Sequence, residues 1–323
     1  MNEKMKVARL SIFSNTVLTI GKLTAGLSMN SVGVISEALH SSLDLVAALI
    51  TFFSVREASK PADEQHRYGH GKFENVAGIV EALLIAAAAV IIIANAIPRL
   101  HTEGDVQFLG LGAVVMGVSA VVNFFVSRKL MQVAKKTESP ALAADAWHLL
   151  TDVYTSLGVF AGIAVMYITG MKIFDPLVAI GVALLIFKAA FDLIRDSMRS
   201  ILDVRLPEAE EQKICEVLNQ FAQEYVEFHN LRTRKAGSER YVDLHLVMPK
   251  NSVVSNVHAI CEKIEDSVRL KLPGVHVLIH TEPCGRYCKD CIRDGAHDAA
   301  PHCRPACDGC ETCNKEQTPE KAP

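Results

Sequence analysis

Two segments of the chain repeat the same pair of residues that can bind metal. His40 precedes Asp44 by four positions, and His148 precedes Asp152 by the same spacing. Residues four positions apart lie on one face of an α-helix, so each pair would present an imidazole and a carboxylate together. Two nitrogen and two oxygen ligands suit tetrahedral Zn²⁺ better than Mg²⁺ or Ca²⁺, which prefer more oxygen ligands. The four residues therefore predict a site for a divalent transition-metal cation.

Both pairs lie in long apolar segments. The 323 residues are 50% hydrophobic and 21% charged, with a mean hydropathy of +0.23. A bilayer core needs about 20 helical residues. Six stretches of that length carry few charges, and we expect a membrane-spanning helix in each: Val7–Leu27, Val32–Val55, Asn75–Ile97, Phe108–Val126, Ala141–Ile168 and Phe174–Ile194. His and Asp are costly in hydrocarbon and mark function by default, so mere hydrogen bonding between neighbouring helices is the less favoured interpretation.

Metal binding at such a site is expected to be coupled to protons. A ligand histidine must be neutral and a ligand aspartate ionised before the cation binds, so metal loading releases protons. We therefore predict metal/proton antiport, with His40 and His148 as the proton carriers. Two other classes stay open: a membrane metalloenzyme with Glu37 or Asp145 as general base, and a membrane metal sensor that does not transport. An enzyme needs an open coordination position, which four protein ligands would close, so we expect no enzyme.

Basic residues predict the orientation in the membrane. Lys and Arg gather in the segments on the side shared by the two termini, whereas the opposite loops hold only Arg99 and Lys172. By the positive-inside rule both termini are cytoplasmic, in a multi-pass protein of the inner (plasma) membrane. The net charge of −3, from 33 Lys and Arg against 36 Asp and Glu, gives no support to a nucleic-acid surface.

Composition divides the chain into three parts. Residues 1–201 form the predicted α-helical membrane domain, residues 202–285 a small cytoplasmic α+β domain, and residues 286–323 a Cys-rich tail without apolar periodicity that we expect to be mostly disordered. The predicted elements of the second part are, in order, a helix, two strands, a helix and a strand: Glu208–Glu224, Asn230–Lys235, Tyr241–Met248, Val254–Leu270 and Gly274–Glu282. This order favours two helices on one face of a short sheet.

Seven of the nine cysteines crowd into the end of the chain. They are Cys284, Cys288, Cys291, Cys303, Cys307, Cys310 and Cys313. Cytoplasmic thiols stay reduced, so this density favours zinc–thiolate binding over a disulfide framework. An iron–sulfur cluster is the second interpretation, although so short a tail offers little fold to shield one, and a tail without function is the third.

At this point the sequence resembles the cation diffusion facilitator family, most closely its bacterial zinc and ferrous-iron exporters. The segments that carry the resemblance are Ser36–Asp44, Pro61–Lys72, Ala144–Asp152, His229–Arg234 and Val277–Cys284. The resemblance implies six transmembrane helices, a cytoplasmic ferredoxin-like domain and a homodimer in the lipid bilayer. It also implies export of Zn²⁺ or a similar ion from the cytoplasm against inward protons.

The resemblance also implies sites residue by residue. The transport site falls on the two pairs already named, but close bacterial relatives often carry Asp where this chain has His40. A second nitrogen ligand favours Zn²⁺ and puts Fe²⁺ in doubt, while Cd²⁺ accepts the same ligands. The other matches are a loop site, a cytoplasmic binuclear site and a dimer ion pair, in that order: Asp63, His66 and His70; His229, His245, His258, His280 and Glu282; Lys72 and Asp203.

Overall fold

The computed structural model describes residues 3–28, 32–99, 110–169 and 173–284. It divides into two compact units, one of Met1–Leu202 with Ala236–Ser238, the other of Asp203–Lys235 with Glu239–Pro323. We describe each unit by itself. The predicted tail, residues 286–323, lies outside the described residues with its six cysteines, whereas Cys284, which precedes it, is described.

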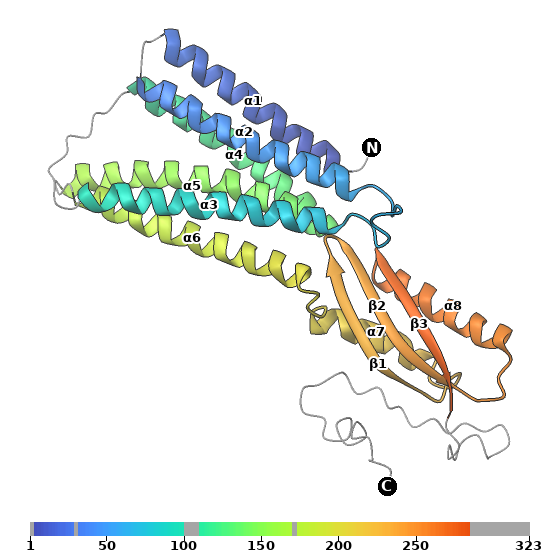
Figure 1. The fold of residues 1–323 in the computed structure, drawn as a ribbon. Helices are drawn as coiled ribbons and strands as arrows, with labels where there is room; N and C mark the ends of the chain where they lie inside the picture. The colour runs from blue at the N-terminus through green and yellow to red at the C-terminus, as the bar shows by residue number, and fades with distance from the viewer. Residues whose placement is uncertain (1–2, 29–31, 100–109, 170–172, 285–323) are drawn as a thin grey trace. The chain divides into compact units, whose positions relative to one another are not determined.

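Within the described residues, the first unit consists of six long helices (Figure 1). They are α1 (Glu3–Ser28), α2 (Val32–Ala58), α3 (Lys72–Arg99), α4 (Gly110–Thr137), α5 (Pro140–Thr169) and α6 (Phe174–Ile201). Within the described residues, two helices are both long and apolar enough to cross a membrane, over Lys72–Pro98 and Pro176–Ile201. A helix of 26 to 30 residues is about 39–45 Å long, which exceeds a hydrocarbon core of about 30 Å.

Alanines let these helices approach closely. Ala47, Ala82, Ala146 and Ala190, on four different helices, are fully buried. Small residues at helix contacts are typical of membrane helices, whose association depends on close packing and not on escape from water. Leucines of α4 and α5 complete the interior, among them Leu130 and Leu149.

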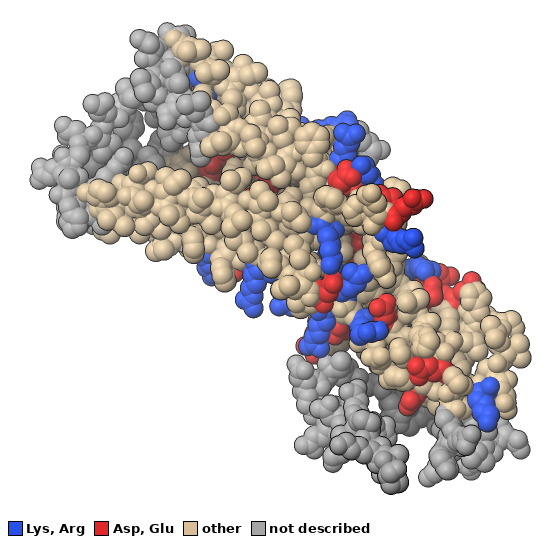
Figure 2. Space-filling model, in the orientation of Figure 1, with Lys and Arg blue, Asp and Glu red and all other residues tan. Residues whose placement is uncertain are grey.

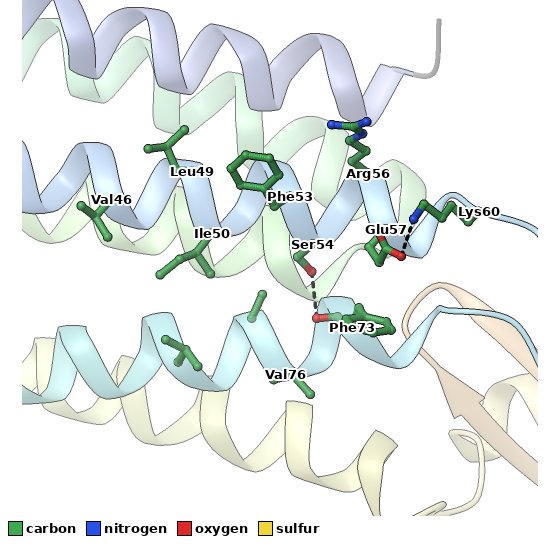
Figure 3. A pocket seen from close by; sticks show the side chains of 12 residues that line it. Val46, Leu49, Ile50, Phe53, Ser54, Arg56, Glu57, Lys60, Phe73 and Val76 are labelled. Atoms are coloured by element: carbon green, nitrogen blue, oxygen red, sulfur yellow. Dashed lines mark hydrogen bonds and ion pairs between the residues drawn. The ribbon is translucent and has the colours of Figure 1, made fainter. Parts of the chain in front are cut away.

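The outward surface of the helical unit is apolar. Large side chains such as Phe13, Phe125 and Leu185 are exposed, and Figure 2 shows a long surface almost without charge, with most of the visible Lys and Arg near one end of the helices. Figure 3 shows that even the pocket between α2 and α3 is lined mainly by apolar residues, with Glu57 and Lys60 at its end. An apolar exterior of this extent fits lipid and not water.

The second unit is a three-stranded mixed sheet with two helices. Its elements are α7 (Glu208–Gln220), β1 (Glu227–Ala236), β2 (Glu239–Met248), α8 (Val254–Lys271) and β3 (Val275–Pro283), and the strand order is β1-β2-β3. A tight turn at Gly237, whose φ of +62° suits glycine, joins β1 to β2. After the α8 crossover, β3 pairs with β2 in parallel. The order of elements is the predicted one.

Both helices of this unit cover one face of the sheet. Val242 and Leu244 of β2 pack with Leu218 of α7 and Ile264 of α8 in one buried cluster. Because successive strand residues point to opposite faces, His245 lies on the other face. The predicted helix Glu208–Glu224 is too long: it ends at Gln220, because the N–H of Phe221 turns back to the carbonyl of Leu218, only three residues earlier.

Candidate metal sites

The first site lies inside the helical unit, where α2 meets α5. His148 Nε2 is 3.2 Å from Asp44 Oδ1, and both side chains are almost completely buried. Asp152 follows one turn later on α5 and interacts electrostatically with His148. His40 lies on α2 one turn before Asp44, but its side chain is outside the described part of the chain. The structure thus joins Asp44 to His148 and places Asp152 in their neighbourhood, but these three are not among the groups of described residues whose ligand atoms all lie within 4.8 Å of one another.

Asn123 on α4 belongs to the same site and was not among the predicted residues. Its Nδ2 donates a hydrogen bond of 3.2 Å to Asp152 Oδ2. An amide that hydrogen-bonds a carboxylate fixes the orientation of that carboxylate. The signal was present in the sequence, since Asn123 is a polar residue within the apolar stretch Phe108–Val126.

The second site is in residues 59–71, which join α2 to α3. His70 Nε2 lies 3.2 Å from Asp63 Oδ2, and His66 Nδ1 lies 3.4 Å from Asp63 Oδ1. One ligand atom from each residue falls within 4.8 Å of the others. Gly69, with a φ of +77°, provides the left-handed turn that places His70 beside His66. All three predicted loop residues therefore converge.

Local hydrogen bonds stabilise the ionised form of Asp63. Asp63 Oδ1 accepts the backbone N–H of His66 at 2.6 Å and that of Gln65 at 2.9 Å. The His66 N–H is the main cause that lowers the pKa of Asp63 below its usual range, and the Gln65 N–H adds to it. The carboxylate is therefore ionised at neutral pH, as metal binding requires.

The third site lies on the open face of the sheet in the second unit. Glu282 of β3 is its centre: Oε1 is 2.8 Å from His245 Nδ1, Oε2 is 3.6 Å from His229 Nε2, and Oε1 is 3.7 Å from His280 Nε2. The parallel register sets His245 opposite His280. Asn230, which was not predicted, places its Nδ2 3.4 Å from His245 Nε2.

Three other predicted residues have neighbours within their own units. His258 on α8 is not among the described residues whose ligand atoms cluster, and its Nε2 lies 3.4 Å from Glu262 Oε1. Lys72 Nζ is 3.4 Å from the carbonyl oxygen of Ile201, and Asp203 Oδ1 is 3.4 Å from Arg234 Nη1. The ion pair between Lys72 and Asp203 stays a prediction. Cys284 is a buried free thiol at the end of β3.

Comparisons with known proteins agree with this division. The family profile described as the cation efflux transmembrane domain matches residues 8–202, and that of the cation efflux protein cytoplasmic domain matches residues 206–284. An uncharacterized transporter of Synechocystis sp., sll1263, is 34% identical over 81% of this chain and 84% of its own length. The cation-efflux pump FieF of Yersinia pestis is 30% identical over 87% of this chain and 93% of its own.

A solved structure of CzrB in its zinc form, described as that of a proposed zinc transporter, is 32% identical. It covers 26% of this chain and 96% of its own, with a TM-score of 0.25. The matches to the two family profiles extend over nearly all of the described chain and include each of the three sites. The chain therefore belongs to the cation efflux family, the cation diffusion facilitators, and is a transporter and not an enzyme.

Proposed function

We propose that this transporter exports Zn²⁺ from the cytoplasm in exchange for protons. The observation that carries the proposal is the contact between His148 and Asp44, 3.2 Å apart and almost completely buried between α2 and α5. A buried imidazole beside a carboxylate can share a proton or bind one metal ion, and these two states exclude each other. Two nitrogen and two oxygen ligands, with His40 and Asp152, favour Zn²⁺; Cd²⁺ would compete because it accepts the same ligands.

Exchange follows from the protonation states of these side chains. With the site open to the cytoplasm, His148 gives up its proton and a cation binds to its nitrogen and to the aspartates. With the site open to the other side, protons from that side return to the histidines and the cation leaves. All six helices cross the inner membrane in this proposal, and both termini are cytoplasmic, as the distribution of Lys and Arg predicts.

The other two sites serve the transport cycle from outside the hydrocarbon core. Asp63, His66 and His70 bind cytoplasmic metal beside the entrance and pass it on. The cluster around Glu282 binds metal that stabilises the cytoplasmic domain in a homodimer, with His258 as a fifth ligand. Lys72 and Asp203 join the protomers at the membrane face. The cysteines of the tail capture zinc as thiolates, and an iron–sulfur cluster there is the less favoured alternative.

Reconstituted vesicles test the transport proposal. The purified chain is inserted into liposomes with a zinc-sensitive dye and a pH-sensitive dye inside. We expect a zinc gradient to drive Zn²⁺ flux with opposite proton movement, and Asp44→Ala or Asp152→Ala to abolish both. Glu216→Gln, on the surface of the second unit, is the control that changes an acidic residue outside the sites. The variants must elute from a gel-filtration column as the wild type does. Zinc flux that persists in such variants without Asp44 and Asp152 would contradict the proposal.

A further inference from the structure

The helical unit buries two more acidic side chains, which none of the three sites uses. Glu81 of α3 and Asp145 of α5 are both 0% exposed. Glu81 Oε1 accepts a hydrogen bond from the hydroxyl of Thr51 on α2, and that hydroxyl also lies 3.5 Å from the carbonyl oxygen of Ala141 on α5. Three helices therefore meet around this pair.

Most of the carboxyl oxygens in this pair lack a partner. Within the described residues, Glu81 Oε2 and both carboxyl oxygens of Asp145 are buried without a hydrogen bond. The hydroxyl of Ser11 on α1, also buried without a hydrogen bond, interacts with the carboxyl group of Asp145. Uncompensated buried carboxylates are strongly destabilising, and two of them that sense each other's charge are more so. A proton on one of them or a metal cation between them would remove these costs.

The pair lies beside the transport site, on the side of residues 59–71. Asp145 precedes His148 by less than one turn of α5, about 4.5 Å along the axis. Thr51, which binds Glu81, follows Asp44 by two turns of α2, about 10.5 Å. Asp145 interacts electrostatically with both Asp44 and His148, and Glu81 interacts with Asp145. The carboxyl groups of Glu81 and Asp145 therefore lie on the side of the transport site that faces residues 59–71, which contain Asp63.

We propose that Glu81 and Asp145 form a second divalent-cation site in the helical unit. The cation would occupy this site on its way between the loop that contains Asp63 and the transport site. This inference rests on the proposed function. The donors are all oxygens, from the two carboxylates with the hydroxyl of Ser11. For a borderline metal such as Zn²⁺, a site with imidazole binds more tightly than a site of oxygens alone. The cation would thus move from a weaker site to a stronger one.

Binding of Mn²⁺ to the full-length chain tests this inference without any transport. Mn²⁺ suits carboxylate ligands and is detected by electron paramagnetic resonance. The starting protein carries Asp44→Ala, Asp63→Ala and Glu282→Ala, which removes a carboxylate from each of the three other sites. We expect it still to bind Mn²⁺, and to lose this binding when Glu81→Gln or Asp145→Asn is added. Asp192→Asn, at an exposed position on α6, is the matched control and should keep it.

Two results would overturn the inference. One is that the starting protein, eluting as a folded species, binds no Mn²⁺; the other is that Glu81→Gln and Asp145→Asn both retain the bound ion. Because binding is measured directly, these results are independent of whether the chain transports zinc.

Flux measurements separate a binding role from a structural one. In the otherwise native chain, Glu81→Gln should raise the zinc concentration for half-maximal flux about tenfold, which corresponds to about 1.4 kcal/mol of binding, with a smaller effect on the maximal rate. A fall in maximal rate at unchanged half-maximal concentration would overturn the proposal. So would a change in the pH dependence of flux alone, since this would assign the pair to protons.

Discussion

The site between α2 and α5 and the site on the sheet contain the same kinds of residue in opposite surroundings. The side chain of Asp44 is 5% exposed, whereas those of Glu282 and His229 are 35% and 46% exposed. Losing a partner in the buried site leaves an uncompensated charge, while on the sheet water takes the partner's place. In the proposed transport cycle, the buried site therefore exchanges protons for metal, and the sheet site binds metal that adds stability.

The largest expected difference between the two sites is in transport. His148→Ala should lower the initial zinc flux by more than the 10- to 100-fold typical of changes around a metal ligand, because it removes a ligand itself. His245→Ala removes the equivalent residue of the sheet site and should leave more than half of the flux. Both are measured in the same vesicles with the zinc-sensitive dye. Equal losses in the two variants would remove the functional distinction between the sites.

The stability of the second unit should depend on the sheet site and not on the buried site. Zinc at 100 times its dissociation constant stabilises the state that binds it by about 2.7 kcal/mol. In the wild type we expect zinc to slow hydrogen exchange at the amides of β2 and β3, and in His245→Ala this protection should be lost. His148→Ala should retain it. Protection of β2 and β3 that persists in His245→Ala would show that zinc binds elsewhere in the second unit.

The preference for one metal ion over another should depend on the buried site alone. Replacing the nitrogen ligand in His40→Asp shifts the set toward oxygen, so the preference for Zn²⁺ over Fe²⁺ should fall about tenfold, by analogy with changes in ligand type. Competition between the two ions for flux measures it. His280→Asp makes the same replacement on the sheet and should leave the preference unchanged. If His40→Asp transports both ions as the wild type does, His40 is not a ligand.

The smallest effect is expected from a residue that touches only a ligand. Asn123→Ala removes the hydrogen bond to Asp152 and should lower zinc flux about tenfold, within the range for groups that orient metal ligands. Asn230→Ala, which removes the neighbour of His245 on the sheet, should leave flux as it is. Initial rates at saturating zinc distinguish the two. An unchanged rate in Asn123→Ala would mean that packing alone positions Asp152.

The sequence by itself determined which side chains are present and how they are spaced along the chain. Because the helical period places residues four positions apart on one face, His148 and Asp152 had to lie together on α5. Asp63, His66 and His70 are close enough in the chain for short turns to bring them together. The alternation of buried and exposed residues in β2 likewise put His245 on the face away from Leu244.

Contacts between distant segments were decided only by the tertiary structure. Asp44 meets His148 across 104 positions of sequence, and helix packing selects which faces touch. The register of β2 against β3, set by hydrogen bonds along the whole strand pair, brings Glu282 to His245. The contacts of Asn123 and of the Glu81–Asp145 pair are made with residues on other helices, and a local sequence pattern does not specify these contacts. The physical reason is that helix and strand periods act over a few residues, whereas packing selects among many ways of joining whole elements.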